Sequence, residues 1–319
     1  MNGGSAAAVR TLNLVKRYGA TTALAGLTMT VQRGEIFGFL GPNGAGKTTA
    51  VKLLIGLTHP TAGEGWVLGA PIGDRETRRR VGYLPELFRY QDWLSAREVL
   101  RLHCRLAGIP RARHAEEIAH ALETVGLAAR ADSRVGAFSK GMQQRLGLGV
   151  ALLGQPDLIF LDEPTSALDP VGRADVRQIV RSLKERGATV FLNSHLLSEV
   201  EQVCDRVAVV DKGRVIAEGS IAEVVGGSNA VRLRIPDAGA ALRGVLARYG
   251  ALASEGEWHT VSGVDEAQIP SLVADVVRAG GQVYAVEPRH HTLEDRFLQL
   301  LGEPERSLQE TWRSDEVTE

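Results

Sequence analysis

The sequence predicts an α/β fold built on a parallel sheet, followed by a smaller α+β domain. Three strand patterns, EIFGFL, DLIFLDEP and ATVFLNSH, are apolar over most of their length, as strands buried on both faces of a parallel sheet are. Helical patterns alternate with these strands, which is typical of α/β domains. The strand patterns run directly into polar motifs, and α/β proteins bind ligands at that edge of the sheet. We expect this domain to extend from about Val9 to about Val225.

The first part of this domain is predicted to be an antiparallel β-subdomain, because apolar and polar residues alternate from Leu27 to Val31. The helical pattern ADVRQIVRSLKERG is expected to be capped at its C-terminal end by Gly187, and a later hairpin is expected to turn at Lys212-Gly213. Only helical patterns occur between about residues 89 and 135, which predicts an inserted helical subdomain. Its histidines lack metal-ligand spacing and are expected to be surface or packing residues: His103, His114 and His120.

The pattern restarts after residue 226 in the order β-α-β-β-α-β, followed by a helix, TLEDRFLQLLG. This predicts a small accessory α+β domain over residues 226–302. The ends, residues 1–8 and 303–319, are expected to be a flexible N-terminus and a polar, acidic, disordered tail.

Composition excludes several classes of function. With 37 basic and 38 acidic residues among 319, the net charge is −1, which gives no general attraction to nucleic acid or anionic membrane. The two cysteines, Cys104 and Cys204, lack CxxC spacing and are expected to be small buried hydrophobes in a reducing compartment. No apolar run reaches the roughly 20 residues that span a bilayer, so we expect a soluble chain without a signal peptide.

The stretch GPNGAGKT fits the phosphate-loop motif GxxxxGK[ST] and lies between a predicted strand and a helical pattern, the context that this motif requires. This predicts a P-loop NTPase. Backbone N–H groups of such a loop surround the phosphates of ATP. Lys47 would neutralise the β and γ phosphates, and the hydroxyl of Thr48 would hold Mg²⁺. The loop comprises Gly41, Pro42, Asn43, Gly44, Ala45, Gly46, Lys47 and Thr48.

Two adjacent carboxylates, Asp162 and Glu163, end the buried strand of LIFLDEP. Buried like charges raise each other's pKa and need a counter-charge; beside a phosphate loop, Mg²⁺ would supply that charge and an attacking water would lie next to the carboxylates. Asp162 would then act through the second shell of the metal, and Glu163 would polarise the water. The alternative is a pair that only caps the strand end. His195, which closes the next strand, is either a structural residue or a contact of the γ phosphate.

A third motif, FSKGMQQR, opens a helix with Ser139 as the expected N-cap and Gly141 leaving the backbone exposed. With the phosphate loop, LIFLDEP, SALD and NSH, it occurs in the order found in the nucleotide-binding subunits of ATP-binding cassette (ABC) transporters. The chain resembles this family from Val9 to about Ala222. The resemblance implies that two chains dimerise head to tail, so that each signature segment contacts the ATP held by the other: Ser139, Lys140, Gly141 and Met142.

The resemblance also implies roles for residues outside these motifs. Tyr18 is similar to the aromatic residue that stacks on adenine, Thr49 extends the phosphate loop, and Asp169 lies in the loop that couples the two ATP sites. Where the family has a glutamine that touches Mg²⁺ and senses the membrane subunit, this sequence has Glu86. The usual signature reads LSGGQ; Phe138, Lys140 and Met142 differ here, as in cassettes of drug and lipid exporters, whose C-terminal extension the restart after residue 226 resembles.

The sequence therefore predicts a cytoplasmic ATPase subunit that uses ATP and Mg²⁺, forms a homodimer, and drives a separate integral membrane permease, in export. It would lie at the inner face of the cell membrane through that permease. A soluble cassette acting on ribosomes or DNA typically carries a second phosphate loop or a long coiled coil, and neither pattern occurs here. A binding-only cassette is disfavoured because Lys47, Asp162, Glu163 and His195 are all present.

Overall fold

The computed structural model describes residues 7–166, 168–226, 230–289 and 292–302. The chain divides between Ile221 and Ala222 into two compact units, a few residues before the expected boundary at 225/226. The predicted flexible N-terminus lies outside the described residues up to residue 6, but Ala8 is fully buried and its N–H donates to the Val31 carbonyl (2.8 Å). The expected tail, 303–319, lies outside the described residues.

The first unit begins with an antiparallel sheet in the order β2-β1-β4-β5. The alternation from Leu27 to Val31 lies within its second strand, which pairs antiparallel with the first, as predicted. Leu27, Met29 and Val31 are buried, and the polar residues between them are more exposed. The strands are β1 (Val9–Tyr18), β2 (Thr21–Val31), β4 (Ala62–Val67) and β5 (Ala70–Pro71).

A six-stranded sheet in the order β10-β9-β3-β8-β7-β6 forms the centre of this unit. All its pairs are parallel except the β9–β10 hairpin, which turns at Lys212 and Gly213 (φ 45° and 75°), as expected. The strands are β3 (Ile36–Leu40), β6 (Val81–Leu84), β7 (Leu158–Asp162), β8 (Thr189–Asn193), β9 (Arg206–Asp211) and β10 (Arg214–Ser220).

One continuous core joins the two sheets through helix α1 (Lys47–Leu54). Leu14 and Leu27 enter it from the antiparallel sheet, and Leu53 enters it from the helix. On the parallel sheet, the Phe191 ring lies at the centre of an aromatic cluster, with ring centroids 5.0 to 5.8 Å away: Phe37, Phe39 and Phe160. The start of α1, directly after the phosphate loop, is therefore fixed by packing on both sides.

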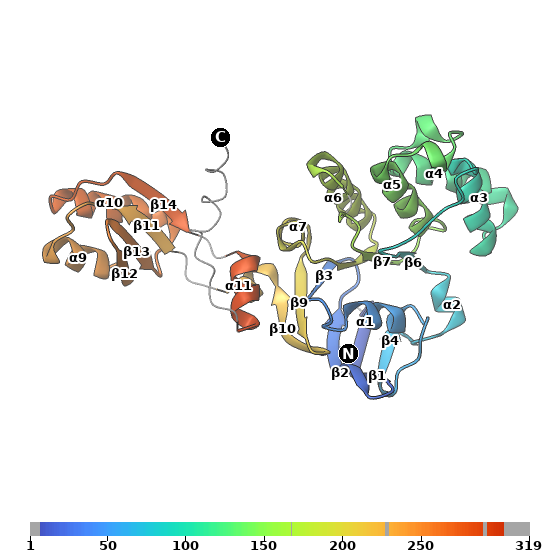
Figure 1. Ribbon diagram of the computed structural model, residues 1–319, viewed down its shortest axis with the longest axis horizontal. Helices are drawn as coiled ribbons and strands as arrows, with labels where there is room; N and C mark the ends of the chain where they lie inside the picture. The colour runs from blue at the N-terminus through green and yellow to red at the C-terminus, as the bar shows by residue number, and fades with distance from the viewer. Residues whose placement is uncertain (1–6, 167, 227–229, 290–291, 303–319) are drawn as a thin grey trace, which may run out of the picture. The chain divides into compact units, whose positions relative to one another are not determined.

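The helical part of the unit is larger than predicted. Helices α3, α4 and α5 lie side by side (Figure 1) and are called the helical layer below. Because α5 belongs to this layer, the layer continues past the expected limit at residue 135. The helix ADVRQIVRSLKERG ends at Glu185 and is capped by Gly187 (φ 86°), as predicted, and the Gly187 N–H donates to the Lys184 carbonyl (2.8 Å). The helices are α2 (Arg75–Arg78), α3 (Ala96–Leu106), α4 (His114–Thr124), α5 (Lys140–Ala151), α6 (Pro170–Glu185) and α7 (Leu197–Val203), with 3₁₀ turns at Arg111–Arg113, Ala128–Arg130 and Val135–Ala137.

The second unit has the predicted β-α-β-β-α-β order, in an antiparallel sheet ordered β12-β13-β11-β14. Two helices pack on one face of this sheet and share its core, which includes Val231, Leu246 and Leu272. Helix α8 (Ile221–Val225) crosses the division between the units. The elements are β11 (Ala230–Arg234), α9 (Ala240–Ala247), β12 (Ala251–Glu255), β13 (Trp258–Ser262), α10 (Ile269–Arg278, after a 3₁₀ turn at Glu266–Gln268), β14 (Ala285–Arg289) and α11 (Leu293–Leu300).

Within the described residues, no helix combines the length and the apolar character needed to cross a membrane.

Candidate nucleotide site

The carboxyl ends of four neighbouring strands, in the order β3-β8-β7-β6, form one edge of the central sheet. Because these strands are parallel, the residues that follow them meet at this edge. The phosphate loop follows β3, His195 follows β8, Asp162 and Glu163 lie at the end of β7, and Glu86 follows β6. The structure thus brings these predicted site residues together from distant parts of the sequence.

The phosphate loop is shaped by close backbone contacts. A Cβ atom on Gly41 would lie 2.3 Å from the carbonyl oxygen of Val210, so only glycine allows this approach to β9. The hairpin turn after β9 supports the loop directly, because the Gly213 N–H donates to the Ala45 carbonyl (2.9 Å). The Gly213 carbonyl in turn accepts from the Ala25 N–H of β2 (3.0 Å). Backbone hydrogen bonds therefore connect the phosphate loop to the β9–β10 hairpin, and connect that hairpin to β2.

Lys47 is buried at the start of α1, and its ammonium donates to the carbonyls of Gly41 (2.6 Å) and Pro42 (3.2 Å). Burial lowers the pKa of this ammonium, while the charges of Glu163, Asp162 and Glu86 oppose that shift. Phosphate oxygens could replace these two carbonyl oxygens as hydrogen-bond acceptors of Lys47, because a charged oxygen is a stronger acceptor for a cation. Two hydroxyl residues follow in the first turn of the helix, Thr48 exposed and Thr49 partly buried.

Asp162 is almost fully buried, and its Oδ1 accepts a hydrogen bond from the Asn193 amide. Burial raises the pKa of the Asp162 carboxyl; the Asn193 hydrogen bond opposes this, and Glu86 and Glu163 raise the pKa further. On the neighbouring strand β6, burial, together with Asp162 and Glu86, raises the pKa of Tyr83 to about 12. This region therefore concentrates negative charge that Lys47 alone offsets incompletely.

Glu163 follows directly and has a left-handed backbone (φ 53°) that is unusual for a non-glycine residue. Its N–H donates to the Asn193 carbonyl (2.9 Å), and its Oε2 lies 2.7 Å from Nδ1 of His195. Since a carboxylate accepts, the imidazole donates in this contact. The Glu163 side chain is 9% exposed and the His195 side chain is 55% exposed. The carboxylate is therefore buried at the sheet edge, while its histidine partner is accessible to solvent.

The donor set suits Mg²⁺. The ion prefers oxygen ligands, and Thr48, Asp162 and Glu86 supply a hydroxyl and carboxylates near the phosphate loop. Beside them, the buried Oδ1 of Asn193 has no hydrogen-bond partner in the described part of the chain, as expected where a water completes a metal's shell. No group of three His, Cys, Asp or Glu side chains there forms a cage. Mg²⁺ typically keeps waters and phosphate oxygens as ligands instead.

The signature residues lie elsewhere, at the N-terminus of α5. Ser139 is the N-cap, as predicted, and its hydroxyl accepts from the Met142 N–H (3.2 Å). Ser139 and Lys140 are exposed, and Gly141 faces Leu168, in the loop that leads to α6. Within the described ranges, no hydrogen bond or ion pair joins the signature residues to the phosphate loop of the same chain.

Two further predicted residues occupy structural positions. Tyr18 ends β1 and is half exposed, with the Lys16 ammonium 4.9 Å from its ring centroid. Asp169 caps α6, because its Oδ1 accepts from the Gly172 N–H (2.8 Å). This cap fixes the start of α6 beside the signature helix, and the Arg145–Asp175 ion pair also joins these two helices.

Sequence reasoning assigned no role at the site to Asn193, Tyr83 or Gly213. The signal for Asn193 was present: in parallel strands that end together, the N of NSH lies opposite the D of LDEP, and the register pairs Asp162 with Asn193. The role of Gly213 gave no such signal, because the turn pattern predicts a hairpin but not what the hairpin touches.

Three features meet at this sheet edge: a phosphate loop after β3, a buried carboxylate pair at the end of β7, and a histidine after β8 that contacts the second carboxylate. Together they define a P-loop ATPase. A family model described as "ABC transporter" matches residues 24–166.

Similar proteins are known along nearly the whole chain. An uncharacterised ABC transporter ATP-binding protein of Nostoc sp. is 40% identical, over 92% of this chain and 88% of the relative. The daunorubicin/doxorubicin resistance ATP-binding protein DrrA of Streptomyces peucetius is 36% identical, over 99% of this chain and 100% of DrrA. The chain therefore belongs to the ATP-binding proteins of ABC transporters, and it is an ATP-hydrolysing transporter subunit.

Solved structures resemble the first unit. The ATP-binding subunit of an ABC transporter is 32% identical, with a TM-score of 0.62, over 68% of this chain and 91% of that one. An ATP-binding cassette solved as a dimer in a post-hydrolysis state, bound to ADP and Pi, is 25% identical, with a TM-score of 0.60, over 66% of this chain and 98% of that one. The fold prediction is thereby confirmed.

Proposed function

We propose that two copies of this chain dimerise head to tail around two ATP and Mg²⁺ and drive a separate membrane permease in export. The observation that carries the proposal is the position of the signature helix. Its N-terminus is capped, exposed and unconnected, among described residues, to the phosphate loop of its own chain. A helix N-terminus is a site for an anion, and the γ phosphate held by a second chain is the anion that a composite site supplies.

Each site residue has a chemical role in this proposal. Lys47 exchanges its two loop carbonyls for phosphate oxygens. Thr48, Glu86 and Asp162 would hold Mg²⁺, Asp162 through the second shell, and the ion would supply positive charge at the transferring phosphoryl group. Glu163 accepts a proton from the attacking water. The Glu163 carboxylate is held in place for this role by its nearly complete burial and by its contact with His195. His195, more exposed than its partner, then contacts the γ phosphate. Tyr18 stacks on adenine, and Thr49 and Asp169 position the loop and the dimer contact.

The surface for the permease is proposed to include Glu86 and the residues after it. Leu87 and Trp93 are 86% and 71% exposed, an apolar exposure that is typical of interaction surfaces. Glu86 follows β6 and also adds to the charge around Asp162 and Lys47. Glu86→Ala is expected to reduce transport more than basal ATP hydrolysis, whereas Glu116→Ala, an exposed carboxylate on α4, should change neither. Equal loss of both activities would indicate a metal-binding role alone.

Export follows from the relatives. DrrA is named for drug resistance, and the Nod factor export ATP-binding protein I of Burkholderia orbicola, 38% identical over 91% of this chain and 95% of the relative, for export. We propose that this chain acts at the inner face of the cell membrane and that the permease selects the exported compound.

The test of the composite site is Glu163→Gln, which retains the phosphate and signature contacts but removes the base. We expect the variant to bind ATP, to stop hydrolysis and to accumulate as a dimer with ATP and Mg²⁺ in light scattering at high protein concentration. Adding Ser139→Arg should return it to monomer, because the bulky side chain would occupy the space that the partner's phosphates fill. Adding Ala129→Arg, on an exposed 3₁₀ turn of the helical layer, should not. A Glu163→Gln chain that binds ATP but stays monomeric refutes the composite site.

A further inference from the structure

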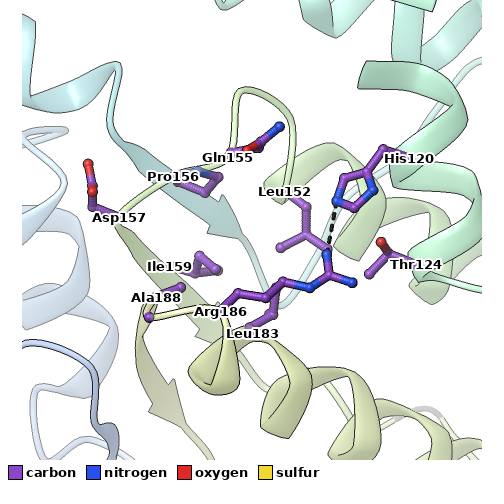
Figure 2. Close-up of a pocket in the computed structure, with 11 residues that line it drawn as sticks. His120, Thr124, Leu152, Gln155, Pro156, Asp157, Ile159, Leu183, Arg186 and Ala188 are labelled. Carbon is purple, nitrogen blue, oxygen red and sulfur yellow. Dashed lines mark hydrogen bonds between the residues drawn. The ribbon is translucent and has the colours of Figure 1, made fainter. Parts of the chain in front are cut away.

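A cavity of about 200 Å³ opens in the first unit between α4, α6 and the beginning of β7 (Figure 2). Its floor is apolar and buried, formed by Leu152, Pro156, Ile159 and Leu183. It lies at the opposite end of β7 from Asp162, so it is separate from the nucleotide site.

Arg186 carries the positive charge at the rim of this cavity. Its Nη1 lies 2.9 Å from Nε2 of His120 on α4, the contact dashed in Figure 2. A guanidinium only donates hydrogen bonds, so this imidazole nitrogen accepts in this contact. Among the described residues, no carboxylate forms a salt bridge with Arg186. Four of its five N–H donors therefore remain for another acceptor beside the cavity.

The one carboxylate that lines the cavity is already neutralised. Asp157 Oδ2 accepts from Nε of Arg80 (2.6 Å), and Figure 2 shows the Asp157 side chain pointing away from Arg186. The other polar lining side chains, those of Thr124 and Gln155, carry no charge. The cavity thus combines an apolar floor with a cation at its rim that is not paired with a carboxylate of the described residues.

We propose that this cavity binds a small amphipathic monocarboxylate, with its apolar chain on the floor and its carboxylate on Arg186. A guanidinium and a carboxylate form paired, charge-assisted hydrogen bonds, the strongest available to this rim. A volume of about 200 Å³ lies below the roughly 300–1,000 Å³ typical of pockets for drug-sized ligands, which favours a short chain of about five or six carbons. Neither a purely polar anion nor a neutral apolar compound uses both halves of the site.

The probe is hexanoate, titrated calorimetrically into the full-length protein without ATP, so that the result does not depend on the proposed function. We expect saturable binding to one site, with acetate and hexanol each at least about tenfold weaker because each lacks half of the ligand. Arg186→Gln should weaken hexanoate binding about tenfold or more. Thr124→Trp should abolish binding, because it fills the cavity from α4.

Arg181→Gln is the matched control, since Arg181 lies on the same helix and donates to the Gln202 carbonyl outside the cavity. This control should bind hexanoate as the wild type does, and Arg186→Gln should bind ATP as the wild type does, because the nucleotide site lies at the other end of β7. The proposal is wrong if hexanoate shows no saturable binding, if acetate binds equally well, or if Arg186→Gln retains wild-type affinity.

Discussion

Gly41→Ala tests whether the phosphate loop depends on its close approach to β9. The added Cβ would lie 2.3 Å from the Val210 carbonyl oxygen and 3.1 Å from the Ala45 Cβ, where ordinary contact begins at 3.4 Å. The nearest atom belongs to the backbone of a central strand and cannot rotate away. The two backbones must therefore separate by about 1 Å, and insertion of a methyl group into a packed site typically costs about 1–3 kcal/mol.

This displacement also reaches the nucleotide, because the Gly41 carbonyl is the 2.6 Å partner of the Lys47 ammonium and moves with the loop. If binding ATP requires the original loop position, the same 1–3 kcal/mol weakens ATP affinity by about 5- to 150-fold. Urea unfolding measures the first effect, and titration with a fluorescent ATP analogue measures the second.

Gly244→Ala is the control, because Gly244 lies inside helix α9 and a Cβ there meets no atom within 4 Å. It should stabilise the second unit by about 0.5–1 kcal/mol through helix propensity and leave ATP affinity unchanged. Wild-type stability together with wild-type ATP affinity in Gly41→Ala would refute the argument that the β9 contact shapes the loop.

Three further outcomes are expected. Phe191→Ala should lower the free energy of unfolding by about 3–5 kcal/mol, measured in urea, because it empties the centre of the aromatic cluster; a loss below about 1 kcal/mol would contradict that packing. The pKa of the Asp162 carboxyl is raised in the folded chain above its ordinary value of 3.8. At a pH between these two values the folded chain therefore binds more protons than the unfolded chain, and the free energy of unfolding falls as the pH rises from about 4 through the folded pKa. Asp162→Asn should remove this pH dependence, and an unchanged pH profile would assign it to other groups. Ser95→Ala removes one half of the capping box with Glu98 at the start of α3 and should cost about 0.5–2 kcal/mol in thermal or urea unfolding; an unchanged free energy of unfolding would show that this cap does not stabilise α3.

Much of the fold was predictable because buried strands and capped helices leave local patterns. The apolar runs that became β3, β7 and β8, the hairpin at Lys212-Gly213 and the N-cap at Ser139 were all identified from short windows of sequence. The β-α-β-β-α-β order of the second unit followed from the same kind of pattern. The predicted helical subdomain ended before α5, although α5 packs on α3 and α4. The sequence around α5 contains no signal for this packing, because the contacts are made with distant parts of the chain.

The candidate site divides in the same way. Residues that lie within motifs were identified directly, and the structure brings Lys47, Asp162, Glu163 and His195 to one sheet edge. The positions of Asn193 and Tyr83 beside Asp162 depend on the order of the strands: β8 lies between β3 and β7, and β6 lies on the other side of β7. Strand order cannot be predicted from a short window of sequence. The strained backbone of Glu163 likewise depends on its hydrogen bond to β8.

The support of the phosphate loop by Gly213 has a consequence for the order of events during synthesis. The loop leaves the ribosome early, but the hairpin turn that supplies its hydrogen bond at Ala45, and the strand against which Gly41 lies, are translated much later. A stalled nascent chain that ends before β9 carries the complete GPNGAGKT motif without its backing. We therefore expect stalled nascent chains to be retained on immobilised ATP only when the stall lies beyond the hairpin, so that retention on ATP marks the completion of the first unit.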